Sequence, residues 1–269
     1  MPPSPLVVIV ATRNRPALLR DRCLPSIAAQ RRRPDEILIV DDSDPGFAAD
    51  NARIVAEACA GGLPAVYDRT PRPSGAAASW NRTLRTAAAR GGHPWIAIHD
   101  DDDQWTPDHL ELCEATAAAS DANVVVSGIR LVLDGVAAPQ PLVQAVTIAD
   151  FLRGNPGWQG SNTFIRLGLL LDVDGFDEQL GACLDRDLAI RVLDAGRARI
   201  AFTSAHTVDF YVDSDRPALS QRGSPSKLVA LRHFFGKHRA RMTPEDRAAF
   251  AERAGRLFGV AADAFEGRA

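Results

Sequence analysis

The chain is short of lysine, of closely spaced cysteines and of any excess of positive charge. Lys227 and Lys237 are the only lysines among 31 basic residues, and 34 acidic residues leave a net charge of -3. Because proteins that bind nucleic acid usually carry a basic excess, we expect no nucleic-acid partner. No two cysteines have CxxC spacing, so the sequence predicts neither a zinc site nor a disulfide framework. The cysteines, which we expect to be reduced, are Cys23, Cys59, Cys113 and Cys183.

The first residues, MPPSPLVVIVATRNRP, lack the features of a targeting signal. They have no basic start, and their apolar run of about six residues is too short for a signal peptide or a membrane span. We therefore expect a soluble cytoplasmic protein with no transmembrane segment. The turn ATRNRP also has no glycine, which argues against a dinucleotide-binding or P-loop motif.

Short β-branched runs alternate with helical patterns through the first half. The predicted strands are 6–11, 36–42, 64–68 and 95–100, and the predicted helices are 16–30, 47–60, 75–90 and one that opens at Thr106 and Pro107, with Thr106 as N-cap. This alternation is typical of a parallel sheet covered by helices on both faces.

The second half is less regular, with predicted strands at 123–133 and 161–167 and a helix over 185–196. The Pro/Gly-rich piece 134–160 is interpreted as an active-site loop, and helices follow Pro225. We expect one α/β domain over 1–223, whose nucleotide-binding half is about 1–105 and whose acceptor half is about 106–223. We expect residues 224–269 to form a helical extension packed on the same domain.

Four aspartates, 100 to 103, follow the fourth predicted strand. Strand alternation would point Asp100 and Asp102 to one side and Asp101 and Asp103 to the other. At about 4 Å and an effective dielectric near 20, two such charges repel by roughly 4 kcal/mol. Solvent, protonation, arginines or a divalent cation could offset this repulsion, and oxygen ligands select Mg²⁺, Mn²⁺ or Ca²⁺.

A solvated loop that caps the next helix is the alternative for this acidic stretch. However, Asp41, Asp42 and Asp44 follow the second predicted strand at the equivalent place. Ligands of open parallel sheets bind beyond the carboxyl ends of the strands, so two acidic strand ends favour a site there. A phosphatase motif would need Thr or Val where Gln104 stands, and the EF-hand pattern fails because Cys183 takes the place of its final glutamate.

Together these segments resemble a family-2 glycosyltransferase of the GT-A fold. VVIVATRNRP is similar to that family's opening strand and turn, DEILIVDDSD to its acidic second strand, and GAAASWNRTLRTA to its asparagine-bearing helix. WIAIHDDDDQWTPDHLE resembles its metal-binding segment, and GFDEQLGACLDRDLAIRVLDAG its later acidic block. The matches run in order over residues 5 to 196. The implied fold is α/β, with a Rossmann-like, mostly parallel sheet flanked by helices.

The resemblance implies metal-dependent transfer of one sugar from a nucleotide donor to an acceptor nucleophile, with inversion. It assigns Asp185 as the general base and Asp102 as a ligand of Mn²⁺ or Mg²⁺, with Asp100 near the ribose or the metal. The other residues on the donor side are Ala11, Thr12, Arg13, Arg15, Asp41, Asp42, Asn81 and Asp101. A cation would stabilise the departing diphosphate, and a carboxylate across the sugar would take the acceptor's proton.

Several positions depart from the family pattern. Leu184 stands where an acidic residue often precedes the base, which makes Asp187 a rival to Asp185. No QxxRW-like segment follows, so transfer of single residues is favoured over processive synthesis.

Residues outside the motifs give further candidates. His206 is either a third metal or diphosphate contact or a structural histidine, and Arg72, which follows a strand, is placed to meet a donor phosphate or to lie on the surface. Trp158 and Asn162 are candidates for the acceptor side of the cleft.

The resemblance implies a UDP or dTDP donor before GDP, and the missing membrane segment favours a soluble acceptor such as a natural product, peptide or saccharide. Two other functions stay open: a sugar-phosphate nucleotidyltransferase, and a non-catalytic GT-A-like protein that binds a nucleotide.

Overall fold

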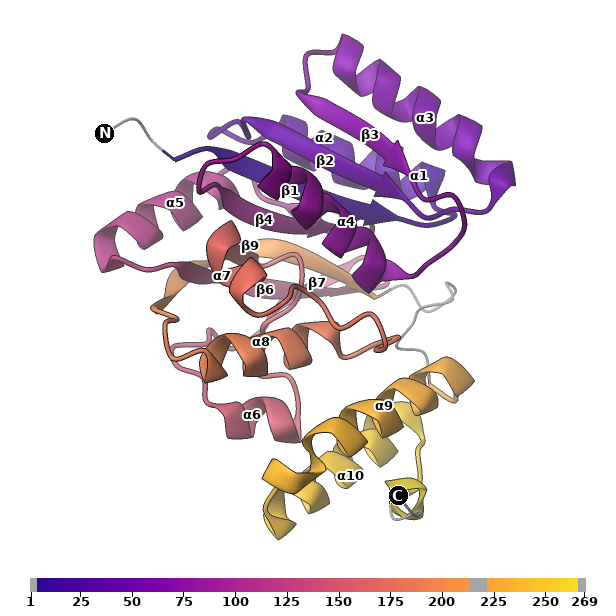
Figure 1. Ribbon diagram of the computed structural model, residues 1–269, viewed down its shortest axis with the longest axis vertical. Helices are drawn as coiled ribbons and strands as arrows, with labels where there is room; N and C mark the ends of the chain where they lie inside the picture. Colours follow the sequence, from indigo (N-terminus) through magenta and orange to yellow (C-terminus); the bar gives the residue numbers. More distant parts are fainter. Residues whose placement is uncertain (1–3, 213–221, 266–269) are drawn as a thin grey trace.

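The computed structural model describes residues 4–212 and 222–265 and contains one mixed sheet with helices on both faces (Figure 1). The strands run in the order β3-β2-β1-β4-β8-β6-β9-β5, and β7 pairs with β6 off this path. Their bounds are β1 Leu6–Thr12, β2 Glu36–Asp41, β3 Ala65–Arg69, β4 Trp95–Asp100, β5 Gln104–Trp105, β6 Val124–Leu133, β7 Val136–Pro139, β8 Thr163–Arg166 and β9 Ile200–Val212.

The helices of the first half are α1 Pro16–Leu18, the π-turn η1 Leu19–Cys23, α2 Leu24–Ala28, α3 Pro45–Ala60, α4 Ala76–Ala89 and α5 His109–Ser120. Those of the second half are α6 Ile148–Arg153, α7 Leu167–Asp172, α8 Leu184–Asp194, α9 Pro225–His238, η2 Arg239–Arg241, α10 Pro244–Phe258 and η3 Ala262–Phe265. No helix among the described residues is long and apolar enough to span a membrane.

A parallel unit of four strands forms the first half of the sheet, as the sequence predicts. β1 pairs in parallel with β2 and β4, and β2 pairs with β3. In this register Thr12 lies beside Asp41, and Ala11 lies beside Asp100. The carboxyl ends of β1, β2 and β4 therefore meet at one edge, while β8 joins β4 in the antiparallel sense.

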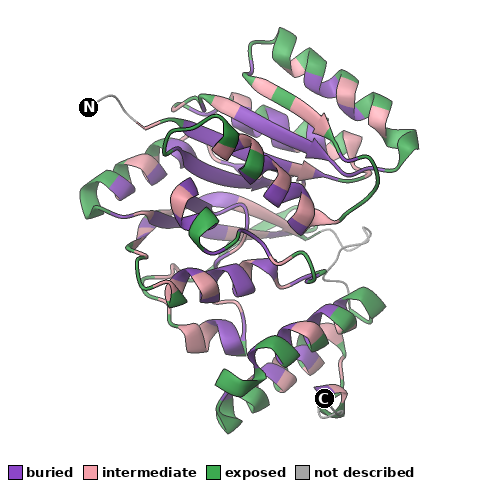
Figure 2. Ribbon diagram, in the orientation of Figure 1, coloured by how far each residue is buried: buried purple, intermediate pink, exposed green. Residues whose placement is uncertain are grey.

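Alternation along the strands divides the core between the two faces of the sheet. Val7 and Ile9 pack in one cluster with α4, α7 and α8, whereas Val8 and Val10 pack in the other with η1, α2, α3 and α5. Figure 2 shows the central strands buried between these layers.

Three local predictions need correction. The helix expected over 16–30 is α1, the π-turn η1 and α2 in succession. Thr106 is not the N-cap of the following helix: α5 starts at His109 with Asp108 as N-cap, because the Thr106 hydroxyl donates to Asp108 Oδ1 at 2.6 Å instead of capping a backbone N–H. Within 134–160, the segment interpreted as a loop, the chain forms β7 and α6.

The C-terminal helices share the core of the sheet domain. Phe234 and Phe250, from α9 and α10, belong to the cluster that contains Leu188 of α8 and Phe151 of α6. Figure 1 shows α9 and α10 beside α6 and α8, at the end of the molecule away from β3. This packing carries α9 and α10 to the N-terminal end of α8, where Asp185 lies.

Candidate active site

The carboxyl ends of β1, β2 and β4 carry Asp41, Asp42 and Asp100 to Asp103, and we call this part of the sheet the acidic edge. Within it, Asp101 joins the ends of β1 and β4. Its Oδ2 accepts from the Thr12 hydroxyl at 2.7 Å, and its Oδ1 accepts from Arg15 Nη1 at 2.9 Å. Burial raises the pKa of Asp101 to about 6, although the charge of Arg15 opposes the shift. Asp101 is therefore a buried anchor for the turn that follows β4.

Asp102 is the more accessible neighbour held by the same arginine. Arg15 Nη1 also donates to Asp102 Oδ2 at 2.8 Å, and 24% of the Asp102 side chain is exposed against 5% for Asp101. Arg22 Nη1 donates to the Asp102 carbonyl at 2.6 Å. The two arginines hold the main chain and the carboxylate of Asp102 at the surface of the site.

Asp100 faces the loop that precedes β8. Its backbone N–H donates to Ser161 Oγ at 3.0 Å, and the Ser161 hydroxyl donates to Asp100 Oδ2 at 3.2 Å. A Cβ on Gly160 would lie 2.7 Å from the same Oδ2, so only glycine allows this approach. Burial, followed by the charges of Asp102 and Asp185, raises the pKa of Asp100 well above its ordinary value.

Two of the acids at the end of β2, Asp41 and Asp42, are buried and bonded within the protein, whereas Asp44 is exposed. Tyr67 donates to Asp41 Oδ2 at 2.6 Å, and the Ser43 N–H donates to Asp41 Oδ1 at 2.8 Å. Asp42 accepts from the Thr70 hydroxyl and from the N–H groups of Ser74 and Gly75, each at 2.8 Å. Asp42 thereby fixes the loop that leads into α4.

Asp185 lies in the first turn of α8. Burial raises its pKa to about 7, against an opposing effect of Lys227. The charge of Asp185 also raises the pKa of Asp100, so the two carboxylates lie within electrostatic range of each other.

Asp187, two positions further along α8, has a different environment. It is fully buried and accepts from Arg191 Nε at 2.7 Å, Lys237 Nζ at 2.7 Å and His238 Nε2 at 2.9 Å. Burial raises its pKa, but hydrogen bonds from His238 and Lys237 and the charge of Arg191 outweigh this and hold the pKa below the ordinary value. Asp187 therefore fastens α9 to α8.

The other donor-side residues divide into exposed and internal groups. Arg13 is half-exposed with Nη1 3.9 Å from Asp42 Oδ2, Arg72 is exposed, and Ala11 is partly buried at the end of β1. Asn81 is internal: its side chain exchanges two 2.8 Å hydrogen bonds with the main chain of Phe176. The structure thus places Asn81 in a turn-fixing contact and does not join it to the acidic edge.

The acceptor-side and metal candidates are also bonded internally. Trp158 is 1% exposed and donates from Nε1 to the Thr163 hydroxyl at 2.8 Å, while Asn162 is fully buried and donates to the carbonyls of Ser127 and Gly157. Both shape the loop that carries Gly160 and Ser161. His206 Nε2 is hydrogen-bonded to the Gln140 carbonyl at 2.7 Å.

Among residues 4–212 and 222–265, no three His, Cys, Asp or Glu side chains form a ready metal cage. Sequence reasoning missed Ser161, Gly160 and Lys227. Nothing local distinguishes the first two, because their contact with Asp100 spans about sixty positions. Lys227 had one available signal, since it is one of two lysines in the chain.

Comparison with known proteins agrees with this geometry. The model of the family described as glycosyl transferase family 2 matches residues 7–176. TarS of S. aureus is similar in structure: its 1–349 form solved with UDP-GlcNAc has a TM-score of 0.67 and 20% identity, covering 96% of this chain and 73% of that one. The same form solved with UDP has a TM-score of 0.64 and 19% identity, covering 95% and 72%.

A longer TarS chain has a TM-score of 0.65 and 20% identity, with 96% of this chain and 44% of TarS covered, so this chain spans less than half of its length. No curated protein matches the sequence. The family match covers more than half of the chain, and the sheet has the arrangement of GT-A neighbours. The chain therefore belongs to glycosyl transferase family 2 and is a glycosyltransferase with the GT-A fold.

Proposed function

We propose that this protein transfers a single sugar, with inversion and with the help of Mn²⁺ or Mg²⁺, from a UDP- or dTDP-sugar to a nucleophile of a soluble acceptor. Family membership supports sugar transfer, and the TarS structures with UDP-GlcNAc and UDP support a nucleotide-sugar donor. The observation that carries the proposal is a pair of carboxylates, Asp100 at the end of β4 and Asp185 in the first turn of α8, whose charges interact.

The donor's diphosphate would lie over the ends of β1 and β4. Arg13 keeps 52% of its side chain exposed there, and Arg15 lies beside Asp102. These guanidinium groups suit phosphate oxygens, which can accept paired hydrogen bonds from two nitrogens of one arginine.

The acidic edge fits a hard divalent cation only in part. All its side-chain ligands are oxygen, and Asp102 is partly open to solvent, as Mg²⁺ or Mn²⁺ requires. Since the described residues supply no complete cage, the diphosphate and water would provide the remaining ligands. When bound, the ion would stabilise negative charge on the leaving nucleoside diphosphate.

Asp185 is better suited than Asp187 to act as general base. A carboxyl with a pKa of about 7 can take a proton near neutral pH, whereas Asp187 is buried and bonded to Arg191, Lys237 and His238. During transfer the acceptor oxygen bonds to the anomeric carbon as its proton passes to Asp185. The bond from that carbon to the diphosphate oxygen breaks on the other face, which inverts the centre.

The test is a panel of nucleotide sugars with Mn²⁺, scored by calorimetric binding and by donor hydrolysis. Asp102→Asn should weaken metal-dependent donor binding at least tenfold. Asp174→Asn, which makes the same change at an exposed aspartate after α7, is the control and should leave binding unchanged. If no nucleotide sugar binds, or if pyrophosphate is released from a sugar phosphate and a nucleoside triphosphate, the proposal is wrong.

A further inference from the structure

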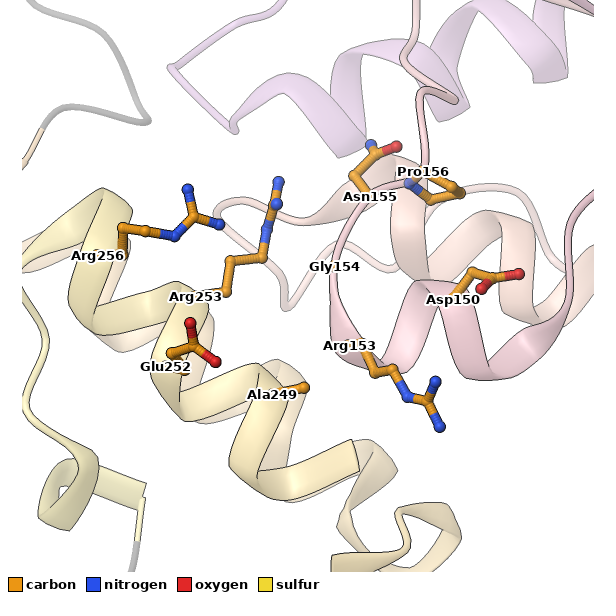
Figure 3. A pocket seen from close by; sticks show the side chains of 9 residues that line it. All are labelled: Asp150, Arg153, Gly154, Asn155, Pro156, Ala249, Glu252, Arg253 and Arg256. Carbon is orange, nitrogen blue, oxygen red and sulfur yellow. The ribbon is translucent and has the colours of Figure 1, made fainter. Parts of the chain in front are cut away.

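Two arginines of α10 face a pocket of about 360 Å³ against the end of α6. Figure 3 shows the guanidinium groups of Arg253 and Arg256 rising from α10 on the side of the loop that carries Asn155, whereas that of Arg153 points away. The stem of Arg253 lies so close to Gly154 that a Cβ there would be 3.1 Å from Arg253 Cδ. A side chain at Gly154 would therefore push the stem of Arg253 aside.

The charges that line this pocket are unevenly paired. Arg153 Nε donates to the buried Asp246 at 2.6 Å, and Asp150 is occupied in the capping box of α6. Within the described part of the chain, the guanidinium groups of Arg253 and Arg256 have no hydrogen bond or ion pair. Burial and then the charge of Arg256 lower the pKa of Arg253. Glu252 supplies an opposing charge at the rim.

Hydrogen bonds link the helix turn that carries the proposed general base to α6, whose end lines the pocket. Arg186, the residue after Asp185, donates to the carbonyls of Phe151 and Leu152 at the end of α6, at distances of 2.7 to 3.1 Å. Lys227 of α9 is electrostatically coupled to both Asp185 and Arg253. The charge of Lys227 is thus felt by the proposed base and by one arginine of the pocket.

We propose that this pocket binds an oxyanion, a phosphate or carboxylate group, that is carried by the acceptor. The acceptor assignment rests on the proposed function, since it takes Asp185 as the base; the anion site itself does not. Two guanidinium groups can each form paired hydrogen bonds with one oxyanion, and partial burial strengthens such bonds. An anion held here leaves the rest of the acceptor directed toward Asp185.

The anion site is tested by titrating the whole protein with inorganic phosphate, and separately with acetate, at constant ionic strength, and following the unfolding midpoint and the heat of binding. Arg253→Gln/Arg256→Gln should weaken phosphate binding at least tenfold, and Glu252→Gln should strengthen it. Arg247→Gln, which removes a charge from α10 outside the pocket, should have no effect. Tighter binding of phosphate than of acetate would assign a phosphoryl group, and the reverse a carboxylate.

Arg13 and Arg15 lie at the acidic edge and could also bind phosphate, so a control must show where the phosphate binds. Phosphate binding that is lost in Arg13→Gln but kept in Arg253→Gln/Arg256→Gln would overturn the anion site. Binding lost only in the α10 variant supports it.

The acceptor role is tested with matched pairs, glycerol with glycerol 3-phosphate and glucose with glucose 6-phosphate. We expect at least tenfold higher kcat/KM, or tenfold stronger inhibition of donor hydrolysis, for the charged member, with the preference lost in Arg253→Gln/Arg256→Gln and kept in Arg247→Gln. Equal use of both members, or a preference that survives in the α10 variant, overturns the acceptor role. Failure of every nucleotide sugar to bind would instead refute the proposed function, and phosphate binding would still decide the anion site.

Discussion

Thr12 donates its hydroxyl hydrogen to Asp101 Oδ2 over 2.7 Å and so joins the ends of β1 and β4, 89 positions apart in the sequence. Asp101 then fixes Arg15, whose Nη1 also reaches Asp102. The buried acid therefore positions the accessible one through a shared arginine. In this arrangement one threonine influences where the proposed cation ligand lies.

Thr12→Val should destabilise the protein by about 1–2 kcal/mol, because it removes a hydrogen bond to a buried carboxylate and leaves that oxygen unpaired. Urea unfolding measures the loss. Thr86→Val is the matched control, since its hydroxyl bonds only to a carbonyl of its own helix. Equal stability of Thr12→Val and the wild type would mean that this bond does not hold the turn.

The parallel half of the sheet could be predicted because its signals are local. β-branched runs mark β1, β2 and β4, and strand periodicity fixes which side chains enter each core cluster. The alternation predicted for Asp100 to Asp103 holds for burial: Asp101 and Asp103 are buried, and Asp100 and Asp102 are partly exposed. Its cause differs, because β4 ends at Asp100 and a turn follows.

Partners that are distant in sequence could not be predicted. Their positions in the sequence make Asp42 and Asp187 candidates for the site. In the structure, however, Asp42 accepts hydrogen bonds from the segment before α4, and Asp187 is bonded to residues of α9. Residue type gives no means of separating an anchoring aspartate from an open one. Two of the partners that occupy Asp187, Lys237 and His238, come from α9, which lies outside the quoted motifs.

Asp185→Asn should remove transfer by a factor of about 10² to 10⁴ and should also stabilise the protein in alkaline solution. The folded pKa of Asp185, about 7, exceeds the ordinary value of about 4, so ionisation costs stability progressively as pH rises between them. The stability advantage of Asp185→Asn should therefore grow from pH 4 to pH 7 and then level off. Asp194→Asn, on the exposed side of α8, is the control for thermal unfolding at pH 5 and pH 8.

The wild-type enzyme should show the same ionisation in its kinetics. Because the base must be ionised, kcat should rise with pH to a plateau above about 7. Full transfer activity in Asp185→Asn, or a rate that does not change between pH 5.5 and pH 8, contradicts the assignment.

Asp187→Asn should reduce stability by about 2–4 kcal/mol, since it removes the charge from a buried carboxylate that pairs with Arg191 and Lys237 and is bonded to His238. Hydrogen exchange should show faster opening of α9. The pKa of Asp187 is lowered by folding, so its contribution is complete above about pH 4 and is lost as pH falls further. The variant and the wild type should converge in acid; an Asp187→Asn protein that is fully stable at pH 7 but inactive would make Asp187 the base.

Gly160→Ala should impair donor binding and turnover by moving Asp100. A Cβ at this position would lie 2.7 Å from Asp100 Oδ2, and that carboxyl is bonded to Ser161, so it has little room to retreat without breaking the bond. We expect at least a tenfold loss in kcat/KM with a small change in the unfolding midpoint, because the clash is with one side chain and not with the core.

Gly168→Ala supplies the control for this change. Gly168 lies within α7, a Cβ there meets nothing within 4 Å, and alanine is the better helix former by about 1 kcal/mol. The control should therefore be active and slightly more stable. Because both variants add the same methyl group to glycines eight positions apart, a loss confined to Gly160→Ala isolates the contact with Asp100, whereas wild-type activity in Gly160→Ala would show that the position of this carboxyl does not limit turnover.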